Sequence, residues 1–149
     1  MNTIDLDTTA KVIIDGNIYL TLATTNGMTP WISPVFYCAD KQYNLYFISQ
    51  PTSLHSRYLK KNKQAAFAIF DSHQPEGTGN GVQGSCFVEK VKGKAVDNAL
   101  KFYKTSFIPL NRQSLSGKNP YRLYKLVPNK VFVLDPSSKV DKRVKVQLN

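Results

Sequence analysis

Hydrophobic and polar residues alternate along much of the chain, and this period of two predicts a mainly β protein. The alternation begins at residues 18–24 (IYLTLAT) and returns at residues 30–38 (PWISPVFYC). β-Branched and aromatic residues are frequent in both segments, as is typical of strands. Further strands are predicted at residues 43–49, 65–71, 82–91, 121–126, 130–134 and 142–148.

Turn signals separate the first three of these strands. Asn26-Gly27 is the strongest short hairpin signal, and Asp40-Lys41 provides a second turn. We therefore expect the first three strands to pair antiparallel in chain order. Pro34 has no N–H to donate to a ladder, so it marks an edge, a bulge or a backbone segment left free for another contact.

Three segments have helical spacing. The first covers residues 6–15, with Asp7 or Thr8 as N-cap and Gly16 as its end. Residues 54–63 form a short basic helix that Thr52 or Ser53 can cap, and residues 95–104 form a third helix. The long segment 105–120 is expected to be a loop.

These elements predict one domain that spans residues 1–149. At 42% hydrophobic residues the chain can fill a single core. About six or seven antiparallel strands with short helices imply a small closed or split β-barrel.

The net charge of +10 is unevenly distributed, because residues 1–56 carry −2 and the remainder carries +12. This excess favours an anionic ligand or a polyanion, although a solvated basic surface would have the same composition. No apolar run is long enough to span a membrane, and the first residues lack a signal-peptide pattern. The expected location is therefore the cytoplasm.

Few residues are suited to metal or covalent chemistry. Cys38 and Cys86 lie in alternating apolar segments and are expected to be buried free thiols, with a disulfide or a reactive nucleophile as alternatives. His55 and His73 are the only histidines, too few for a transition-metal site. No catalytic residues can be assigned, and common hydrolase motifs are absent.

The end of the third predicted strand is the candidate site. Ser49, Ser53 and His55 flank the start of the basic helix, with Arg57, Lys60 and Lys61 nearby. Free N–H groups at a helix start, together with hydroxyl and basic side chains, suit a phosphate group. The alternative interpretation is that Thr52 or Ser53 only caps the helix and that the basic residues face water.

Three sequence blocks, in this order, resemble a known superfamily: GMTPWISPVFYCAD, LYFISQPTSLHSRYLKKNKQAAFAIFD and GVQGSCFVEKV. They are similar to the FMN-binding split-barrel superfamily, which includes pyridoxamine 5′-phosphate oxidase. The resemblance implies a six-stranded antiparallel split β-barrel that forms a homodimer. It also implies that two FMN molecules bind in clefts at the subunit interface.

The resemblance also implies which residues contact FMN. Ser33 and Cys38 stand where one strand of the oxidase has an arginine and a lysine. Leu54 and His55 stand where its phosphate-binding turn has a second arginine and a second lysine. FMN should therefore bind more weakly here and depend more on hydroxyls and the helix start. Gln83 resembles a glutamine that binds the polar edge of the ring, but it could also be an ordinary outward strand residue. The implied cofactor-binding set is Ser33, Pro34, Val35, Ile48, Ser49, Ser53, Leu54, His55 and Gln83.

Three functions remain open from the sequence. The first is a flavin-dependent oxidoreductase acting on a small substrate. True pyridoxamine phosphate oxidation is not expected, because the arginine-rich C-terminal signature of the oxidase is not reproduced. The second is a non-catalytic protein that stores, delivers or senses a flavin or haem, and the third is a nucleic-acid-binding barrel that uses the basic C-terminal half.

Overall fold

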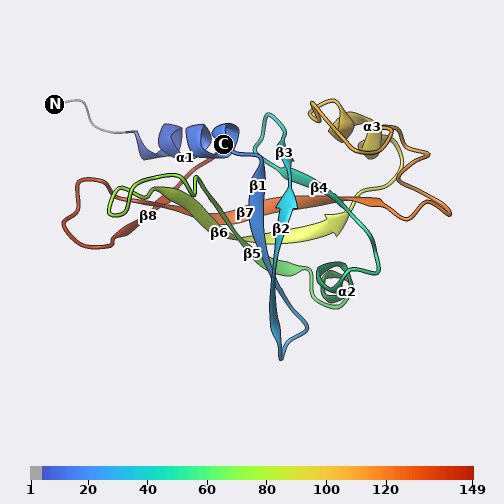
Figure 1. Cartoon of the computed structure of the whole chain (residues 1–149), viewed down its shortest axis with the longest axis horizontal. Coiled ribbons are helices and arrows are strands. Elements are labelled where there is room, and N and C mark those ends of the chain that lie inside the picture. The colour runs from blue at the N-terminus through green and yellow to red at the C-terminus, as the bar shows by residue number, and fades with distance from the viewer. Residues whose placement is uncertain (1–4) are drawn as a thin grey trace.

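The computed structural model describes residues 5–149, which form one antiparallel sheet of eight strands with three helices (Figure 1). The helices are α1 (Leu6–Gly16), α2 (Leu54–Lys61) and α3 (Lys94–Leu100). The strands are β1 (Tyr19–Thr25), β2 (Pro30–Phe36), β3 (Cys38–Ala39), β4 (Leu45–Ser49), β5 (Gln64–Phe70), β6 (Gly81–Lys90), β7 (Arg122–Leu134) and β8 (Arg143–Val146).

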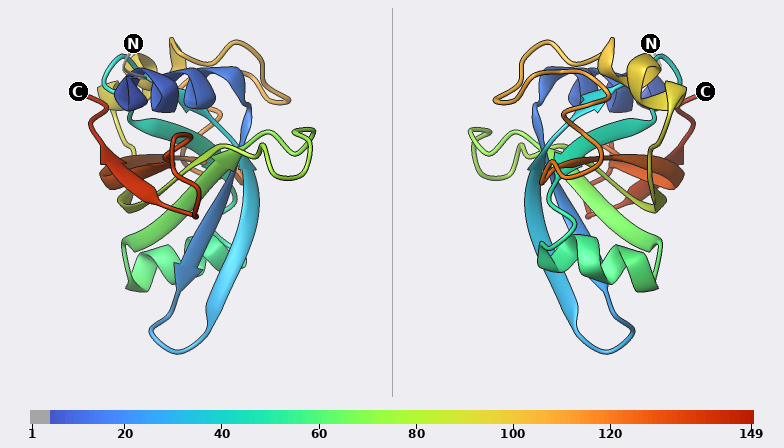
Figure 2. Two further views of the ribbon diagram at one scale, coloured as in Figure 1. Left: turned by 90° about the vertical axis from the view of Figure 1, so that its left-hand side faces the viewer. Right: turned by 90° about the vertical axis from the view of Figure 1, so that its right-hand side faces the viewer.

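The sheet curls into a half-barrel because its two edges are joined by a single residue. The strand order is β2-β1-β5-β6-β7-β4-β3, with β8 paired to β7. Only Tyr37 separates β2 from β3, so these opposite edges meet and the sheet wraps round (Figure 2). Tyr37 is fixed at this junction, since its N–H donates to the carbonyl of Ile18 (3.0 Å) and its hydroxyl to that of Ile14 (2.5 Å). This architecture confirms the mainly β fold class.

The inward face of the curled sheet forms the main core. Helices α1 and α2 lie at opposite ends of it (Figure 2), and α1 contributes Ala10 and Ile14. Burying one leucine or phenylalanine side chain in such a core contributes about 1.5–3 kcal/mol. The strand residues of this core with no exposed surface are Leu22, Leu45, Phe47, Leu126 and Val133.

A second, smaller core lies on the outer side of β4 and β7. Tyr46 and Leu123 point outward there and are covered by α3 and by the segment that follows it. Residues 105–120 contain no helix or strand, as predicted. Leu115 is nevertheless buried in this cluster, so part of the segment packs against the sheet.

The prediction that the first three strands pair in chain order is wrong for the third. β1 and β2 form a hairpin, but β4 pairs with β7, and β2 is an edge strand. The break follows from Tyr37, where the chain leaves one edge of the sheet and enters the other. The edge position of Pro34 agrees with the expectation for a residue without an N–H.

The two strands expected on either side of Pro128-Asn129 are one continuous strand, β7. A register shift between Ser85 and Cys86 leaves Asn129 as an extra residue opposite β6, and the Ser85 hydroxyl donates to its side-chain oxygen (2.5 Å). The bulge accommodates the proline, which cannot donate to the ladder, without ending the strand.

The helix ends also differ from the predictions. Asp5 caps α1 in place of Asp7 or Thr8, because its carboxylate accepts the N–H of Asp7 (3.1 Å). α3 ends at Leu100, since the N–H groups of Phe102 and Tyr103 bond to carbonyls three residues back. The N-cap of α2 is Ser53, one of the two predicted residues.

Candidate functional site

The predicted phosphate corner exists as a polar cluster where β4 ends and α2 begins. The turn between them is closed by Ser53, whose N–H (3.1 Å) and hydroxyl (2.8 Å) both donate to the carbonyl of Gln50. This arrangement holds the Ser53 side chain beside the last residue of β4, Ser49, with their hydroxyl oxygens 3.3 Å apart.

His55 lies at the centre of the cluster and connects three elements. Its Nε2 lies 2.7 Å from the Ser49 hydroxyl and 3.1 Å from that of Ser53. Its Nδ1 lies 3.1 Å from the hydroxyl of Ser33 on β2. Burial lowers the pKa of His55 below its ordinary value, so the ring is neutral at neutral pH. A neutral imidazole donates from one nitrogen and accepts at the other, which hydroxyl partners can match in either tautomer.

The hydroxyl cluster continues inward over an aromatic floor. Ser56 Oγ lies 2.8 Å from Ser53 Oγ, and the Ser56 side chain also neighbours Tyr124. The Phe47 ring stacks on Tyr124 with centroids 5.1 Å apart and presents an edge-type contact to His55 at 6.2 Å. The apolar floor limits water on one side of the cluster, so a charge held on its open side interacts more strongly with nearby dipoles.

The start of α2 retains unsatisfied donors. Ser53 makes no side-chain bond to the helix N–H groups, because its hydroxyl donates to the carbonyl of Gln50 and lies against the hydroxyls of Ser49 and Ser56 instead. The first amides of a helix have no carbonyl partners within the helix, and its dipole is positive at this end. The corner therefore offers N–H groups, hydroxyls and a protonatable ring to an anion.

Arg122 is a residue of this corner that the sequence interpretation missed. It is the antiparallel partner of Ser49, so both side chains project from the same face of the sheet. Its guanidinium donates to the carbonyls of Gly117, Asn119 and Tyr121, each at 2.6 Å. These bonds hold the segment 117–121, which leads into β7, against the Arg122 side chain. Only the β4–β7 register reveals this neighbour, and that pairing was not predicted.

The structure brings together four of the nine predicted cofactor residues: Ser33, Ser49, Ser53 and His55. Val35 follows Ser33 on the inward face of β2 and is buried in the main core. Leu54 is the half-buried first residue of α2. Ile48 points outward to the second core.

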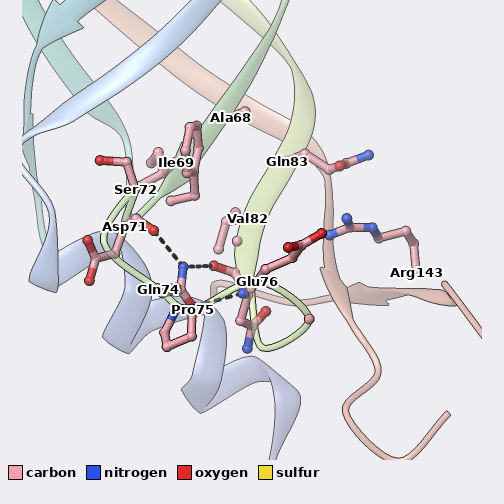
Figure 3. Close-up of a pocket in the computed structure, with 15 residues that line it drawn as sticks. Ala68, Ile69, Asp71, Ser72, Gln74, Pro75, Glu76, Val82, Gln83 and Arg143 are labelled. Carbon is pink, nitrogen blue, oxygen red and sulfur yellow. Dashed lines mark hydrogen bonds between the residues drawn. The ribbon is translucent and has the colours of Figure 1, made fainter. Parts of the chain in front are cut away.

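Pro34 and Gln83 lie on the outer face of the sheet. They belong to one cross-strand row, with Thr21 and Ala68 between them. Gln83 lines a cavity of about 410 Å³ under the loop 71–80, beside Arg143 of β8 (Figure 3). The Gln74 side chain closes this loop by accepting the N–H of Asn80 (2.8 Å) and donating to its carbonyl (2.9 Å). Within one copy of the chain, Gln83 and the His55 corner are thus on different faces.

Both cysteines are free, as expected; Cys86 is buried, whereas Cys38 is only half-buried. Burial raises the pKa of both Cys38 and Cys86 to about 12, which makes the thiolate scarce at neutral pH. Residues 5–149 contain no group of three or more His, Cys, Asp or Glu that could hold a metal ion. Among the described helices, none is long and apolar enough to cross a membrane.

Comparison with known proteins identifies the fold. No protein-family model and no curated protein sequence matches the chain. Solved structures do match: a haem-binding protein from Mycobacterium smegmatis gives a TM-score of 0.75 at 15% identity and covers 99% of this chain. The chain spans 63% of the length of that protein.

Two further structures match over most of both chains. The haem storage protein HutZ from Vibrio cholerae gives a TM-score of 0.71 at 17% identity, covering 87% of this chain and 95% of its own. A putative pyridoxamine 5′-phosphate oxidase from Listeria innocua gives a TM-score of 0.62 at 12% identity, covering 87% of this chain and 98% of its own. The chain therefore has the split-barrel fold of pyridoxamine 5′-phosphate oxidase-like proteins, which is also the fold of the two haem proteins and of a FAD-binding protein from Mesorhizobium loti (TM-score 0.60, 13% identity, covering 85% of this chain and 91% of that protein).

Proposed function

We propose that this chain binds FMN with the phosphate at the His55 corner and acts as a flavin-dependent oxidoreductase on a small substrate. The supporting observation is the cluster itself: Ser49 and Ser53 hydroxyls converge on His55 beside the start of α2, whose first amides receive no side-chain bond from the N-cap. The Ser49 hydroxyl, the His55 ring and the first amides of α2 can each donate a hydrogen bond to a phosphate oxygen, and the Ser53 hydroxyl can do so once it releases the Gln50 carbonyl. Arg122 on the neighbouring strand adds a positive charge.

The corner is weaker than one built from several cations. His55 is neutral in the ligand-free chain because burial lowers its pKa. A phosphate dianion next to the ring would favour the protonated form, so binding takes up a proton and costs the desolvation of the imidazolium. We therefore expect weak FMN binding and partial loss of the cofactor during purification.

The ring of the flavin has suitable partners on β2. As an edge strand, β2 is paired on one side only, so its other backbone groups are open to the polar edge of a ring. Ser33 to Val35 occupy the middle of this strand, next to the phosphate corner. Bound flavin would supply the redox chemistry, while these residues hold and orient it.

A homodimer explains how Gln83 could take part. Three strand spacings separate it from Pro34, or about 14 Å at roughly 4.8 Å for each spacing. One flavin can contact both residues when they come from two copies. The outer sheet face near them carries exposed apolar residues that a second copy would cover: Ile32, Phe70 and Phe87 are 64%, 54% and 41% exposed.

Haem storage is the second candidate, because two of the matching structures are a haem-binding and a haem storage protein. His55 could supply an imidazole ligand only after it released hydroxyl partners from one of its ring nitrogens. His73 lies on the loop 71–80, and 92% of its side chain is exposed. The hydroxyl environment of His55 favours phosphate over iron as its ligand.

Spectroscopy on the purified protein distinguishes these functions. We predict flavin absorbance after addition of FMN, and bleaching of that absorbance in stopped-flow mixing with NADH or NADPH. Binding without bleaching by either donor would favour storage or sensing over catalysis. A haem spectrum with no flavin uptake at excess FMN would contradict the proposal.

A further inference from the structure

A row of cations continues from the phosphate corner along the same face of the sheet. Ser49 is paired with Arg122, and Lys90 at the end of β6 is paired with Tyr124. The N–H of Val91 donates to the carbonyl of Leu123 (2.9 Å), which extends this register by one residue. Continuing it places Lys92 opposite Arg122, so Ser49, Arg122 and Lys92 follow one another across three neighbouring chain segments.

Helix α2 adds a fourth cation to this row. Lys60 is exposed in its last turn, and its charge acts on Lys90. The pKa of Lys90 is lowered, first by partial burial and then by the charges of Arg122, Lys92 and Lys60. We call Lys60, Lys90, Lys92 and Arg122 the cationic rim. None of the ion pairs found in residues 5–149 includes a member of the rim.

Four cations without an acidic partner destabilise one another, because like charges at short range repel. The rim is also continuous with a corner that offers hydroxyls and helix N–H groups. Neighbouring strands are only about 4.8 Å apart, so a second phosphate attached to the first would reach Arg122 and the lysines beyond it. A ligand with a single phosphate would occupy the corner and leave the lysines unpaired.

We propose that the cationic rim binds the second phosphate of a pyrophosphate-bridged dinucleotide, a specificity that extends the FMN phosphate site proposed above. Two ligands share this chemistry, namely FAD as the flavin and a nicotinamide dinucleotide as the electron donor. Lys90 and Lys92 are the discriminating residues, because they lie beyond the reach of the corner hydroxyls. Arg122 lies between the corner and the lysines and contributes its charge to both phosphates, while its guanidinium stays bound to the carbonyls of Gly117, Asn119 and Tyr121.

Calorimetric titrations of the full chain with phosphate, pyrophosphate, FMN, FAD, NADH and reduced nicotinamide mononucleotide test this proposal. We expect pyrophosphate to bind more tightly than phosphate, and either FAD or NADH to bind more tightly than its single-phosphate counterpart, FMN or reduced nicotinamide mononucleotide. The double variant Lys90→Gln/Lys92→Gln, which removes the two lysines, should weaken the binding of pyrophosphate and of the preferred dinucleotide about tenfold or more. The affinity for FMN should fall less than about threefold.

The control is Lys139→Gln/Lys145→Gln, which makes the same change in charge at exposed positions on and next to β8. Equal weakening of pyrophosphate by both double variants would show a general charge effect and overturn the proposal. Tight FMN binding with no preference for any pyrophosphate ligand would overturn it while leaving the FMN site intact. Failure to bind FMN, with pyrophosphate selectively lost in Lys90→Gln/Lys92→Gln, would instead overturn the proposed flavin function and support the rim.

Discussion

His55 shows how one residue can fix a site in a chain with few catalytic side chains. Its ring bonds to hydroxyls from β2, from β4 and from the turn before α2. The sequence predicted that Ser49, Ser53 and His55 would gather, because they lie within seven positions of one another. It could not predict that Ser33 reaches His55 through a hydrogen bond, because this contact depends on the curl of the whole sheet.

Burial of a neutral histidine makes stability depend on pH. The folded pKa of His55 is lowered, so between it and the unfolded value of about 6.5 the unfolded chain binds more protons. The stability from neutral His55 is complete above the unfolded pKa and is lost as pH falls through this range. We expect the free energy of unfolding, measured in urea, to fall between pH 7.5 and pH 5.5. His55→Gln should show a shallower fall, and identical slopes in both proteins would contradict the assignment.

At the scale of the elements, the β6–β7 pair holds the least predictable feature of the fold. The sequence indicates strands at both places, but the bulge at Asn129 and the unbroken β7 depend on the pairing partner. Gly84 lies within this pair. A Cβ atom at this position would overlap the carbonyl oxygen of Lys130, so the two strands approach closely only because residue 84 is glycine.

Gly84→Ala should therefore destabilise the protein. The added Cβ overlaps a backbone atom, which cannot shift without disturbing the strand pairing. Overpacking of this kind lowers the free energy of unfolding by about 1–3 kcal/mol or more. Urea midpoints compared with the wild type measure the effect. Gly79→Ala is the matched control, since a Cβ there meets nothing within 4 Å. Equal stability of the two variants would show that β6 and β7 are not in contact as described.

At the scale of the whole molecule, the sequence predicted one mainly β domain, and most strands lie within two residues of their expected places. The closure of the sheet was not predictable, because a single residue, Tyr37, carries the chain from one edge to the other. Local alternation reports which side of a strand is buried, but not which strand lies next to it. The sequence did not indicate Arg122 as a site residue, because its closeness to Ser49 follows from the β4–β7 pairing.

The proposed dimer can be tested through its apolar face. We expect the wild type to elute as a dimer in size-exclusion chromatography with light scattering. Ile32→Asp should give monomers and weaker FMN binding, because a charge would be buried at the interface and Gln83 of the second copy would be removed from the site. Val140→Asp introduces the same charge at a 73% exposed position on the loop before β8 and should remain dimeric. If both variants remain dimeric, the interface lies elsewhere.

The central claim is that a phosphate group is recognised where β4 meets α2, and the affinities of FMN and riboflavin test it most directly. Riboflavin has the same ring without the phosphate, so the ratio of the two dissociation constants isolates the corner. We predict that FMN binds more tightly and that His55→Ala weakens FMN by about tenfold to a hundredfold while leaving riboflavin nearly unchanged. His73→Ala should leave both affinities as they are. A wild type that binds FMN and riboflavin equally, or an FMN affinity that survives His55→Ala, would contradict the account.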